Sequence, residues 1–535
     1  MSKQLMLGNQ AVAQGLYECG CEIVSSYPGT PSTEITEYAT KYDEIYTEWA
    51  PNEKVACEVA IGASIGGKRS FCAMKHVGLN VAADPLFTAS YTGVNAGMVI
   101  VVADDPGMHS SQNEQDSRHY AISSKVPMLE PANSAECLEF TKLAFEISEQ
   151  FDTPVIIRLC TRIAHSQSLV ETSKRVAVAK KEYTKNPAKY VMMPGMAKKR
   201  HPFVEERTKK LTEYGETSPL NKVIINENAK IGIISSGTAY QYAREVMGNE
   251  ASYLKIGLVN PLPVKLIKDF ASKVEKLYVI EELDDVIETH IKKMGIAVIG
   301  KEIFPVCDEF SQNLVRKAFG KEVPSFDVLD EEIPNRPPVM CAGCPHRGLF
   351  YALSKNKITV SGDIGCYTLG ALAPLAAIDT TICMGASISG LHGFNKATNG
   401  YKNTVAVIGD STFMHSGITG LANISYNGGN STVIVLDNSI TGMTGHQQNP
   451  TTGYNIKGDP ATKISIEKVC DAVGINSVTV VDPFDLEKTE KVIKEELQKE
   501  EPSVIISRRP CALLKNVKKY PPFSVNEKNC KSCKA

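Results

Sequence analysis

Apolar residues recur along this chain in short runs that alternate with segments of helical spacing. In residues 1–175 the strand-like runs include CEIVSSYPGT, GMVIVVADD and TPVIIRLC. Between them lie helix-like segments such as NEKVACEVAIGASIGGK and SAECLEFTKLAFEISEQF. This alternation predicts a parallel β-sheet covered by helices, and we therefore expect an α/β domain at the N-terminal end of the chain.

The same alternation returns twice further along the chain. Within residues 225–325, KIGIISSGTAYQYAREVM predicts a strand, a glycine turn and a helix, and EKLYVIEEL predicts another buried strand. Residues 341–520 alternate again. Lysine and arginine are dense within residues 176–224, and residues 326–340 are rich in proline and acidic side chains, so both segments are expected to be linkers.

The length and charge of the chain narrow the classes of protein to which it can belong. With 535 residues it is too long for one domain, and its formal net charge of −2 gives no electrostatic reason to bind nucleic acid or an anionic membrane. The N-terminus lacks the basic-then-apolar pattern of a signal peptide, and no apolar run is long enough to span a bilayer. We expect a cytoplasmic protein with neither nucleic acid nor membrane as a partner.

The cysteine content agrees with a reducing compartment. Fifteen cysteines is an odd number in a chain without a secretion signal, so a disulfide framework is not expected. Seven cysteines stand in apolar or mixed surroundings and are predicted to be buried thiols: Cys57, Cys72, Cys137, Cys160, Cys307, Cys383 and Cys470.

Two neighbouring predicted strands each end on a side chain that carries oxygen. TVAVIGD ends at Asp410, a helical stretch follows, and STVIVLDN ends at Asn438. Because strands joined by one helical crossover run parallel, both side chains are expected at the same carboxyl edge, where ligands bind. Carboxylate, amide and carbonyl oxygens suit Mg²⁺, and Gly409 and Gly442 would let phosphate oxygens approach the backbone. Each dipeptide taken singly is also an ordinary turn former after a strand.

Cysteines form a second set of candidate ligands. Cys341 and Cys344 form a C-x-x-C, Cys366 stands at a predicted strand end, and Cys511 follows another strand. Four cysteines near the predicted loops of one domain suggest a single tetrathiolate site. Such a site suits either zinc or a [4Fe–4S] cluster.

The motif GDS followed by DN resembles the signature of thiamin diphosphate enzymes, and TGMTGHQ resembles a turn of their oxidoreductase branch. In that family the matching Asp and Asn side chains and a carbonyl two residues later bind the metal. The resemblance therefore implies a Mg²⁺ site at Asp410, Asn438 and Ile440. It also implies that the coenzyme is bound by Gly365, Gly385, Gly409, Asp410, Ser411, Asn438, Ile440, Gly442 and Thr444.

The N-terminal region resembles another part of one such family. EVAIGASIGG resembles the glutamate-bearing helix of the thiamin-dependent 2-oxoacid:ferredoxin oxidoreductases, and YPGTPSTEI resembles their Tyr-Pro-x-Thr-Pro-Ser turn. The resemblance implies that Glu58 bonds N1′ of the coenzyme and that Thr30 lies beside the reacting carbon. His109 and Arg118 are candidates for binding the substrate, because an arginine can clamp a carboxylate. Each is equally well explained as part of a polar surface loop.

Over residues 1–520 the best match is the large (α) subunit of the indolepyruvate-oxidising branch of this family. The match implies three-layer parallel-sheet domains of the thiamin-diphosphate-binding fold at residues 1–175 and 341–520. Between them it implies a smaller transketolase-C-terminal-like domain at residues 225–325. Residues 521–535 would begin a truncated ferredoxin-like domain.

The resemblance also implies an activity, which is oxidative decarboxylation of aryl 2-oxoacids. Indolepyruvate, CoA and oxidised ferredoxin would give indoleacetyl-CoA, CO₂ and reduced ferredoxin. Because electrons must leave the reaction, a [4Fe–4S] cluster is favoured over zinc at the four cysteines. The tail CKSCKA resembles the opening of a ferredoxin motif, so Cys530 and Cys533 would belong to an incomplete cluster. A smaller β subunit and ferredoxin are the implied partners, in an αβ hetero-oligomer.

Three alternatives stay open. A non-oxidative thiamin decarboxylase or ligase acting on a 2-oxoacid would keep Asp410, Asn438 and Glu58 but would need no tetrathiolate. A catalytically silent electron-transfer or scaffold subunit would not need Glu58. A zinc-stabilised thiamin enzyme would hold zinc at the four cysteines. Iron analysis and thiamin-dependent release of CO₂ separate these possibilities.

Overall fold

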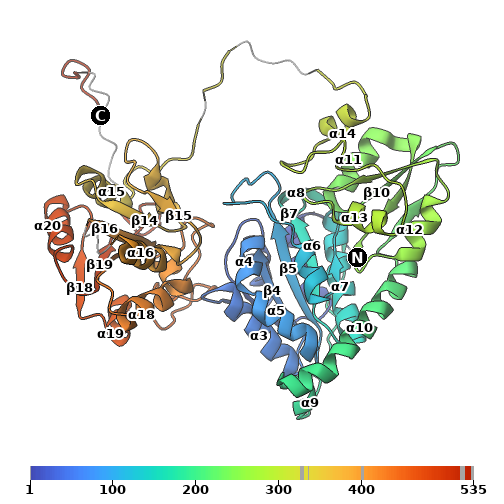
Figure 1. The fold of residues 1–535 in the computed structure, drawn as a ribbon, viewed down its shortest axis with the longest axis horizontal. Coiled ribbons are helices and arrows are strands. Elements are labelled where there is room, and N and C mark those ends of the chain that lie inside the picture. The colour runs from blue at the N-terminus through green and yellow to red at the C-terminus, as the bar shows by residue number, and fades with distance from the viewer. Residues whose placement is uncertain (1, 326–330, 335, 399–402, 519–523, 532–535) are drawn as a thin grey trace. The chain divides into compact units, whose positions relative to one another are not determined.

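The computed structural model describes residues 2–325, 331–334, 336–398, 403–518 and 524–531 of the chain. The chain divides into two compact units (Figure 1). The first unit comprises Met1–Glu332 and Asn455–Asp459, and the second comprises Ile333–Tyr454 and Pro460–Ala535.

A seven-stranded sheet forms the centre of the first unit. Its strands are β2 (Ile23–Ser26), β3 (Tyr46–Trp49), β4 (Ser70–Lys75), β5 (Met98–Asp104), β6 (Met128–Leu129), β7 (Val155–Cys160) and β12 (Leu258–Asn260). They lie in the order β12–β6–β7–β5–β4–β2–β3, and all neighbours pair in parallel except β12 with β6. The three predicted strand runs of this region are confirmed. β4, β5 and β7 are buried along their whole length, as parallel strands covered on both faces must be.

Helices cover both faces of this sheet. Val101 packs with one set of helices and Val102 with the other, because successive side chains of a strand point to opposite faces. Asn52 and Asn133 cap the two predicted helices α3 and α7 by accepting backbone N–H groups, which fixes where each helix begins. The helices are α1 (Gly8–Glu18), α2 (Thr33–Ala39), α3 (Glu53–Ile65), α4 (His76–Val81), α5 (Ala83–Thr92), α6 (Arg118–Ser124), α7 (Ser134–Phe151) and α8 (Thr161–His165).

A smaller four-stranded sheet also belongs to the first unit. It consists of β9 (Lys222–Ile224), β10 (Ile231–Ser235), β11 (Ala251–Lys255) and β13 (Lys276–Ile280), in the order β13–β10–β11–β9. Only β9 is antiparallel to its neighbour. Its helices are α11 (Gly237–Met247), α12 (Val264–Ala271), α13 (Val286–Lys293) and α14 (Gln312–Ala318). Ile234 and Leu254 of this sheet share one apolar core with Ile100 of the large sheet.

Part of the segment that the sequence assigns to a linker is helical. It forms α9 (Pro187–Tyr190) and the 24-residue α10 (Pro194–Thr217). Val204 and Leu211 on α10 are buried, and Arg207 donates hydrogen bonds to the carbonyl oxygens of Ser90 and Asp152, both at 2.9 Å. The run of charge is therefore the solvated side of a packed helix. A separate antiparallel ribbon pairs β1 (Ser2–Leu7) with β8 (Gln167–Thr172).

The second unit is built on a six-stranded sheet in which every neighbour pairs in parallel. Its strands are β14 (Thr359–Gly362), β15 (Thr380–Thr381), β16 (Thr404–Gly409), β17 (Thr432–Asp437), β18 (Ser477–Val481) and β19 (Ser503–Arg508), in the order β15–β14–β16–β17–β19–β18. Its helices are α15 (His346–Lys355), α16 (Ala386–Ala397), α17 (Asp410–Thr412), α18 (Ile418–Tyr426), α19 (Ile466–Ala472) and α20 (Leu486–Glu496).

Two apolar clusters lie on opposite faces of the six-stranded sheet. Val407 and Ile434 face one cluster, whereas Ile408 and Val435 face the other. Helices therefore cover the sheet from both sides. The multidomain α/β architecture with parallel sheets, expected from the sequence, is confirmed in both units.

The predicted burial of seven cysteines is right for five and wrong for two. Cys307 and Cys383 are exposed, while the other five are buried. Cys307 lies in an exposed loop between the core residues Phe304 and Phe310, and Cys383 follows the exposed Ile382, so apolar neighbours in the sequence misjudged both. Within the described residues, no helix is both long enough and apolar enough to cross a membrane.

Candidate active site

Asp410 stands directly after β16, at the carboxyl edge of the six-stranded sheet. Its side chain is buried, and its Oδ1 accepts the N–H of Ser411 at 2.8 Å. Its Oδ2 accepts a hydrogen bond from the hydroxyl of Thr451 at 3.2 Å. Burial and the nearby carboxylate of Asp437 raise the pKa of Asp410 to about 7. This edge therefore holds a carboxylate whose charged form lacks compensation by a cation.

Asn438 follows β17, which pairs in parallel with β16, so both residues leave the sheet at the same edge. This part of the prediction is confirmed. The backbone carbonyl of Asn438 accepts the N–H of Cys511 at 3.0 Å, and its side-chain Oδ1 accepts the N–H of Ile440 at 3.2 Å. Ser439 between them has a φ of 60°, a left-handed conformation that turns the chain sharply.

The oxygen groups at this edge fit a small hard cation. Buried Asp410 supplies a carboxylate, Asn438 an amide oxygen and Ile440 a backbone carbonyl, the donor types that Mg²⁺ prefers. A divalent cation would also offset the effect of burial and of Asp437 and favour the charged form of Asp410. Within the described part of the chain, no three His, Cys, Asp or Glu side chains stand in a metal-binding arrangement. The Mg²⁺ role of these residues stays a prediction.

Sequence reasoning missed two side chains that hold Asp410 in place. The hydroxyl of Thr451 and the amide of Asn449 both contact Oδ2 of Asp410, the latter at 3.5 Å, and both side chains are buried. Asn449 also donates to the hydroxyl of Thr441 at 3.4 Å, and Thr441 donates to the hydroxyl of Ser411 at 2.9 Å. A polar residue in a long turn gives no pattern that would reveal such contacts.

A buried aspartate that the sequence did not single out organises the start of α16. Asp363, after β14, accepts the N–H groups of Gly385 at 2.9 Å and Ser387 at 3.0 Å. Gly385, predicted to bind the coenzyme, has a φ of 87° and forms the N-cap of α16. Tyr367 packs so closely on Gly409 that a Cβ there would lie 2.7 Å from the ring. The coenzyme contacts predicted for Gly365, Gly385, Gly409, Ser411, Gly442 and Thr444 stay predictions.

The four cysteines of the second unit lie close enough for their charges to interact. Burial and the neighbouring thiols of Cys344, Cys511 and Cys341 together raise the pKa of Cys366 to about 11. The N–H of Cys344 donates to the carbonyl of Cys341 at 3.1 Å, as a C-x-x-C turn requires. Nε2 of His446, which the sequence reasoning missed, lies 3.8 Å from the sulfur of Cys511. Among the described residues these four thiols do not stand in a metal-binding arrangement, and the shared tetrathiolate site stays a prediction.

Of the two C-terminal cysteines, only one belongs to the described residues. Cys530 is exposed, and Cys533 lies outside the described residues. Their assignment to an incomplete ferredoxin-type cluster stays a prediction.

Glu58 does not occupy the position that the sequence predicts for it. Its side chain is 45% exposed and pairs with Lys54 on the solvent side of α3. The buried carboxylate of this helix belongs instead to Glu53, in the first turn, where residue exposure is 4%. Glu53 contacts Gly78, since a Cβ at Gly78 would lie 2.7 Å from Oε1 of Glu53. The expected burial of Glu58 is therefore wrong, and Glu53 is the buried glutamate of this helix; which of the two serves the coenzyme stays a prediction.

Helical spacing could have distinguished the two glutamates. Glu53 shares the buried face of α3 with Ala56, Cys57, Ala60 and Ser64, at intervals of three, four, seven and eleven residues. Glu58, five residues further on, points away from that face. The apolar neighbours of Glu58 in the sequence misled the prediction because adjacent helical residues do not share a face.

Thr30 lies in the loop after β2, next to the carboxyl end of β4. It is half-buried, and a Cβ on the adjacent Gly29 would lie 3.1 Å from the Cβ of Lys75. β2 and β4 pair in parallel, so the loop and the end of β4 belong to one edge of the sheet. The position fits a ligand-facing residue, and the role of Thr30 stays a prediction.

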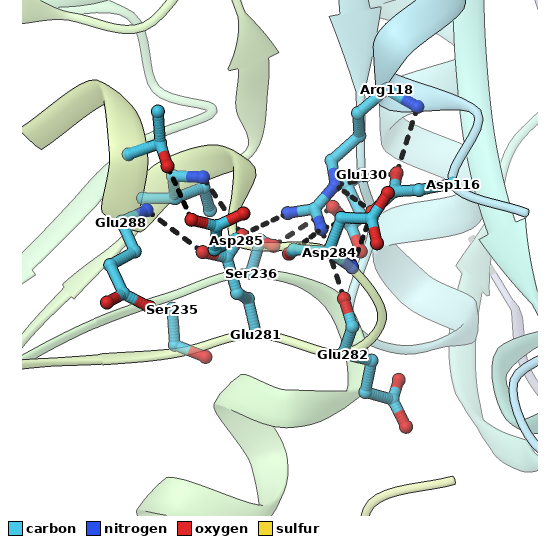
Figure 2. A network of polar contacts seen from close by, with 12 residues as sticks. Asp116, Arg118, Glu130, Ser235, Ser236, Glu281, Glu282, Asp284, Asp285 and Glu288 are labelled. Carbon is cyan, nitrogen blue, oxygen red and sulfur yellow. Dashed lines mark hydrogen bonds and ion pairs between the residues drawn. The ribbon is translucent and has the colours of Figure 1, made fainter. Parts of the chain in front are cut away.

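Arg118 is buried and its donors are already engaged. It pairs with Asp116 at 2.5 Å and with Glu281, and it donates to the carbonyls of Glu282 and Asp284, both at 3.0 Å. Figure 2 shows its guanidinium group facing Asp116 and the segment around Glu281. A substrate carboxylate would have to displace these partners. The structure thus places Arg118 in a contact between the two sheets of the first unit, against the substrate-binding role expected from the sequence.

His109 lies on the surface, as the alternative interpretation of its loop expects. Its ring pairs with Glu309 at 2.8 Å, and Arg162 pairs with the same carboxylate. The side chain of His109 is 46% exposed. These contacts join two loops to Arg162 of α8 around the largely buried carboxylate of Glu309.

Two protein-family profiles match the chain. The profile described as pyruvate flavodoxin/ferredoxin oxidoreductase, thiamine diphosphate-binding, matches residues 14–224. The profile described as thiamine pyrophosphate enzyme, C-terminal TPP-binding domain, matches residues 363–507. The second match contains both Asp410 and Asn438.

Several relatives match nearly the whole chain. The indolepyruvate oxidoreductase subunit IorA of Pyrococcus horikoshii is 41% identical, with 99% of this chain and 90% of the relative covered. The protein of the same name from Archaeoglobus fulgidus is 40% identical, with 96% and 87% covered. The 2-oxoglutarate synthase subunit KorA of Methanothermobacter thermautotrophicus is 24% identical over 51% of this chain and 86% of its own length.

Among solved structures, the 2-oxoglutarate:ferredoxin oxidoreductase from Magnetococcus marinus has a similar fold. The TM-score is 0.51 at 18% identity, with 59% of this chain and 65% of that chain covered. Fold, sheet edges and profiles together define a thiamin diphosphate-binding oxidoreductase subunit. Within that class, the identity of about 40% with the two IorA relatives over nearly the whole chain determines the family. The chain belongs to the indolepyruvate oxidoreductase subunit IorA family.

Proposed function

We propose that this chain is the large, thiamin-binding subunit of an enzyme that oxidatively decarboxylates aryl 2-oxoacids. Indolepyruvate, CoA and oxidised ferredoxin would be converted into indoleacetyl-CoA, CO₂ and reduced ferredoxin. The observation that carries this proposal is the identity of 41% with an indolepyruvate oxidoreductase subunit, over 99% of the chain. The fold-level likeness to a ferredoxin-linked 2-oxoacid oxidoreductase supports it.

Residues of each unit have separate tasks in this proposal. When bound, thiamin diphosphate supplies a nucleophilic carbon and an electron sink, Mg²⁺ holds its diphosphate, and a [4Fe–4S] cluster accepts electrons. Asp410, Asn438 and the carbonyl of Ile440 would hold the metal. Glu53 replaces Glu58 as the acid that bonds the aminopyrimidine ring. Buried at 4% exposure, it can keep a proton-sharing hydrogen bond free of competing water.

The four clustered cysteines are proposed as the cluster ligands. Cys344 and Cys366 are partly buried, and burial together with repulsion from the three neighbouring thiols raises the pKa of Cys366. Binding to iron would deprotonate the thiols and remove that repulsion. Zinc at the same residues would also fit the ligands, and metal analysis of anaerobically prepared protein distinguishes them.

The proposal includes partners and a location. A smaller β subunit in an αβ hetero-oligomer, CoA and ferredoxin follow from the reaction. The fourteen cysteines among the described residues are all free thiols, which supports the cytoplasm as the compartment. The formal net charge of −2 supports the absence of a nucleic-acid partner.

The test is an anaerobic assay of the chain with its β subunit, CoA, thiamin diphosphate, Mg²⁺ and a viologen dye. Indolepyruvate, phenylpyruvate and pyruvate are compared, with CO₂ and reduced dye measured in parallel. We expect CoA-dependent dye reduction that is fastest with the aryl substrates. Release of CO₂ without dye reduction would instead identify a non-oxidative decarboxylase.

A matched pair of variants on α3 tests the glutamate assignment. Glu53→Gln should lower thiamin-dependent CO₂ release by about a hundredfold or more, because the proton-sharing bond to the ring is lost. Glu58→Gln, five residues away on the solvent face, should leave the rate within about twofold of wild type. The opposite ranking would restore Glu58 and refute the placement of Glu53.

A further inference from the structure

Two polar residues at the end of β4 are buried at the carboxyl edge of the seven-stranded sheet. Lys75 is the last residue of the strand and is 8% exposed, and His76 begins α4 and is 1% exposed. β4 lies between β2 and β5, so this pair stands among the strand ends that carry the Thr30 loop and Asp104. In open parallel sheets this is the edge at which ligands bind.

Lys75 is a buried cation whose direct contacts are neutral. Its Nζ donates to the carbonyl of Ser110 at 2.6 Å and to the hydroxyl of Ser110 at 3.2 Å. None of the ion pairs formed among the described residues includes Lys75. Burial lowers the pKa of Lys75 to about 8, and the more distant Asp105 offsets only part of that effect.

The carboxylate of Asp105 is itself fully occupied by other donors. It accepts the N–H of Ser110 at 2.8 Å, the hydroxyl of Ser111 at 2.5 Å and the hydroxyl of Thr161 at 2.7 Å. Asp105 therefore cannot approach the ammonium group without losing these bonds. One N–H of Lys75 thus has no partner among the described residues.

The other buried cations near this edge differ from Lys75. Arg118 pairs with Asp116 and Glu281. Arg158 pairs with Asp104 at 2.6 Å and with Glu130 at 2.6 Å. Lys75 therefore differs from both arginines in being buried at a strand end without a paired carboxylate.

His76 adds a second unsatisfied group at the same place. Neither of its ring nitrogens makes a well-aligned hydrogen bond among the described residues, although the backbone of Asn113 approaches the ring and favours its charged form. Burial lowers the pKa of His76, so the ring is neutral and carries one N–H donor and one acceptor. A buried polar group without a partner is unfavourable, and a native structure retains such a group where a ligand or water meets it.

We propose that Lys75 and His76 bind the carboxylate of the aryl 2-oxoacid substrate. The ammonium group of Lys75 meets one carboxylate oxygen, and an N–H of His76 donates to the other. This inference rests on the proposed function and assigns to these two residues the task that the sequence gave to Arg118.

The neighbours of the pair fit this assignment. Gly29, beside Thr30, contacts the Cβ of Lys75, and Gly78, two residues after His76, contacts Glu53. The chain on either side of the pair therefore adjoins the two residues proposed to face the reacting centre. A carboxylate held there would be oriented by charge at one end and would leave the rest of the substrate to face Thr30 and Glu53.

A comparison of two unreactive ligands tests the site on the wild-type holoenzyme. 3-Phenylpropionate carries the carboxylate, whereas 3-phenylpropionamide has the same shape without the charge. Isothermal titration calorimetry of the anaerobic αβ enzyme should show the acid binding at least about tenfold more tightly than the amide. Equal affinities would overturn the proposal, and this result does not depend on the folding of any variant.

Substitutions at Lys75 and His76 then test whether these residues cause the preference for the acid over the amide. Lys75→Met and His76→Phe should each bring the acid-to-amide affinity ratio towards one, and Lys75→Arg should retain most of it. In the kinetic assay, Lys75→Met should raise KM for phenylpyruvate by about tenfold or more, with a smaller effect on kcat. Lys54→Met removes an exposed lysine of the same unit and serves as the matched control, with an unchanged ratio.

The outcomes separate this inference from the proposed function. If the wild-type enzyme shows no thiamin-dependent CO₂ release from any aryl 2-oxoacid, the proposed function fails. If the wild type is active but Lys75→Met and His76→Phe both keep the wild-type ligand ratio and KM, only the carboxylate site fails. Far-UV circular dichroism and thermal unfolding confirm that each variant is folded.

Discussion

Replacing Arg118 with methionine should destabilise the first unit rather than weaken substrate binding. The guanidinium group has partners from both sheets of that unit, namely Asp116 near the large sheet and Glu281 at the end of β13. Methionine keeps most of the length of the side chain but removes the charge. Two buried carboxylates would then remain without their main cation.

The size of the effect follows from burial. Arg118, Asp116 and Glu281 have side chains that are at most 1% exposed, so water cannot replace the lost contacts. Burial alone would raise the pKa of Asp116. The guanidinium groups of Arg118 and Arg158 nevertheless hold this pKa well below its usual range. Removing one partner of a buried ion pair costs about 3–5 kcal/mol, and we expect Arg118→Met to fall in that range.

The assay is urea unfolding of the αβ enzyme at constant protein concentration, followed by far-UV circular dichroism. Arg162→Met is the matched control, because its side chain is 58% exposed and its partner Glu309 keeps His109 as a second partner. That variant should lose less than about 1 kcal/mol. Adding Asp116→Asn and Glu281→Gln to Arg118→Met should recover part of the loss, since the unpaired charges disappear with their cation.

One result would refute this reasoning. If Arg118→Met unfolds within about 1 kcal/mol of wild type while KM for phenylpyruvate rises about tenfold, Arg118 binds substrate as the sequence predicts. The buried contacts of Arg118 would then be dispensable. A large loss of stability with an unchanged KM in the folded fraction supports the structural role.

Three further predictions concern other parts of the chain. Burial raises the pKa of Glu282 from an ordinary 4.5 to about 7, so the folded protein loses stability as pH rises between these values. Glu282→Gln should therefore be more stable than wild type at pH 8, by up to about 3 kcal/mol, and no more stable at pH 4.5. Thermal unfolding at both pH values measures this difference. An equal effect at both pH values would exclude titration of Glu282 as the cause. A Cβ at Gly78 would lie 2.6 Å from Cγ of Glu53. Gly78→Ala should therefore lower CO₂ release about tenfold to a hundredfold at nearly unchanged stability, and a wild-type rate would show that Glu53 need not stand there. Cys366→Ala should lower the iron bound per chain in anaerobic metal analysis. Cys383→Ala changes an exposed cysteine outside the proposed cluster and should leave the iron content unchanged. Equal iron in both variants would reject the tetrathiolate site.

Much of the fold follows from short patterns in the sequence. The runs ending at Asp410 and Asn438 are strands, and they pair in parallel as one helical crossover requires. These features depend on alternation and on residues near one another in the chain. Local patterns are enough for them because a buried parallel strand must be continuously apolar.

The errors involve the direction of a side chain or a distant partner. Glu58 was preferred to Glu53 although helical spacing places only Glu53 on the buried face. Arg118 finds Glu281 at a separation of 163 residues, and no local pattern reports such a contact. Asp363 was overlooked because its partners, the N–H groups at the start of α16, belong to a helix more than twenty residues away.

The strand β12 has a consequence for how this protein can be rearranged. It arises from the region of the small sheet but pairs with β6 at the edge of the large sheet, and one apolar core continues through both. A chimaera joined near residue 225 would strip an edge strand from one parent and open a core shared by two. Exchanges between relatives should therefore transfer residues 1–325 as a single block, even though the alternating pattern of the sequence suggests two separable modules.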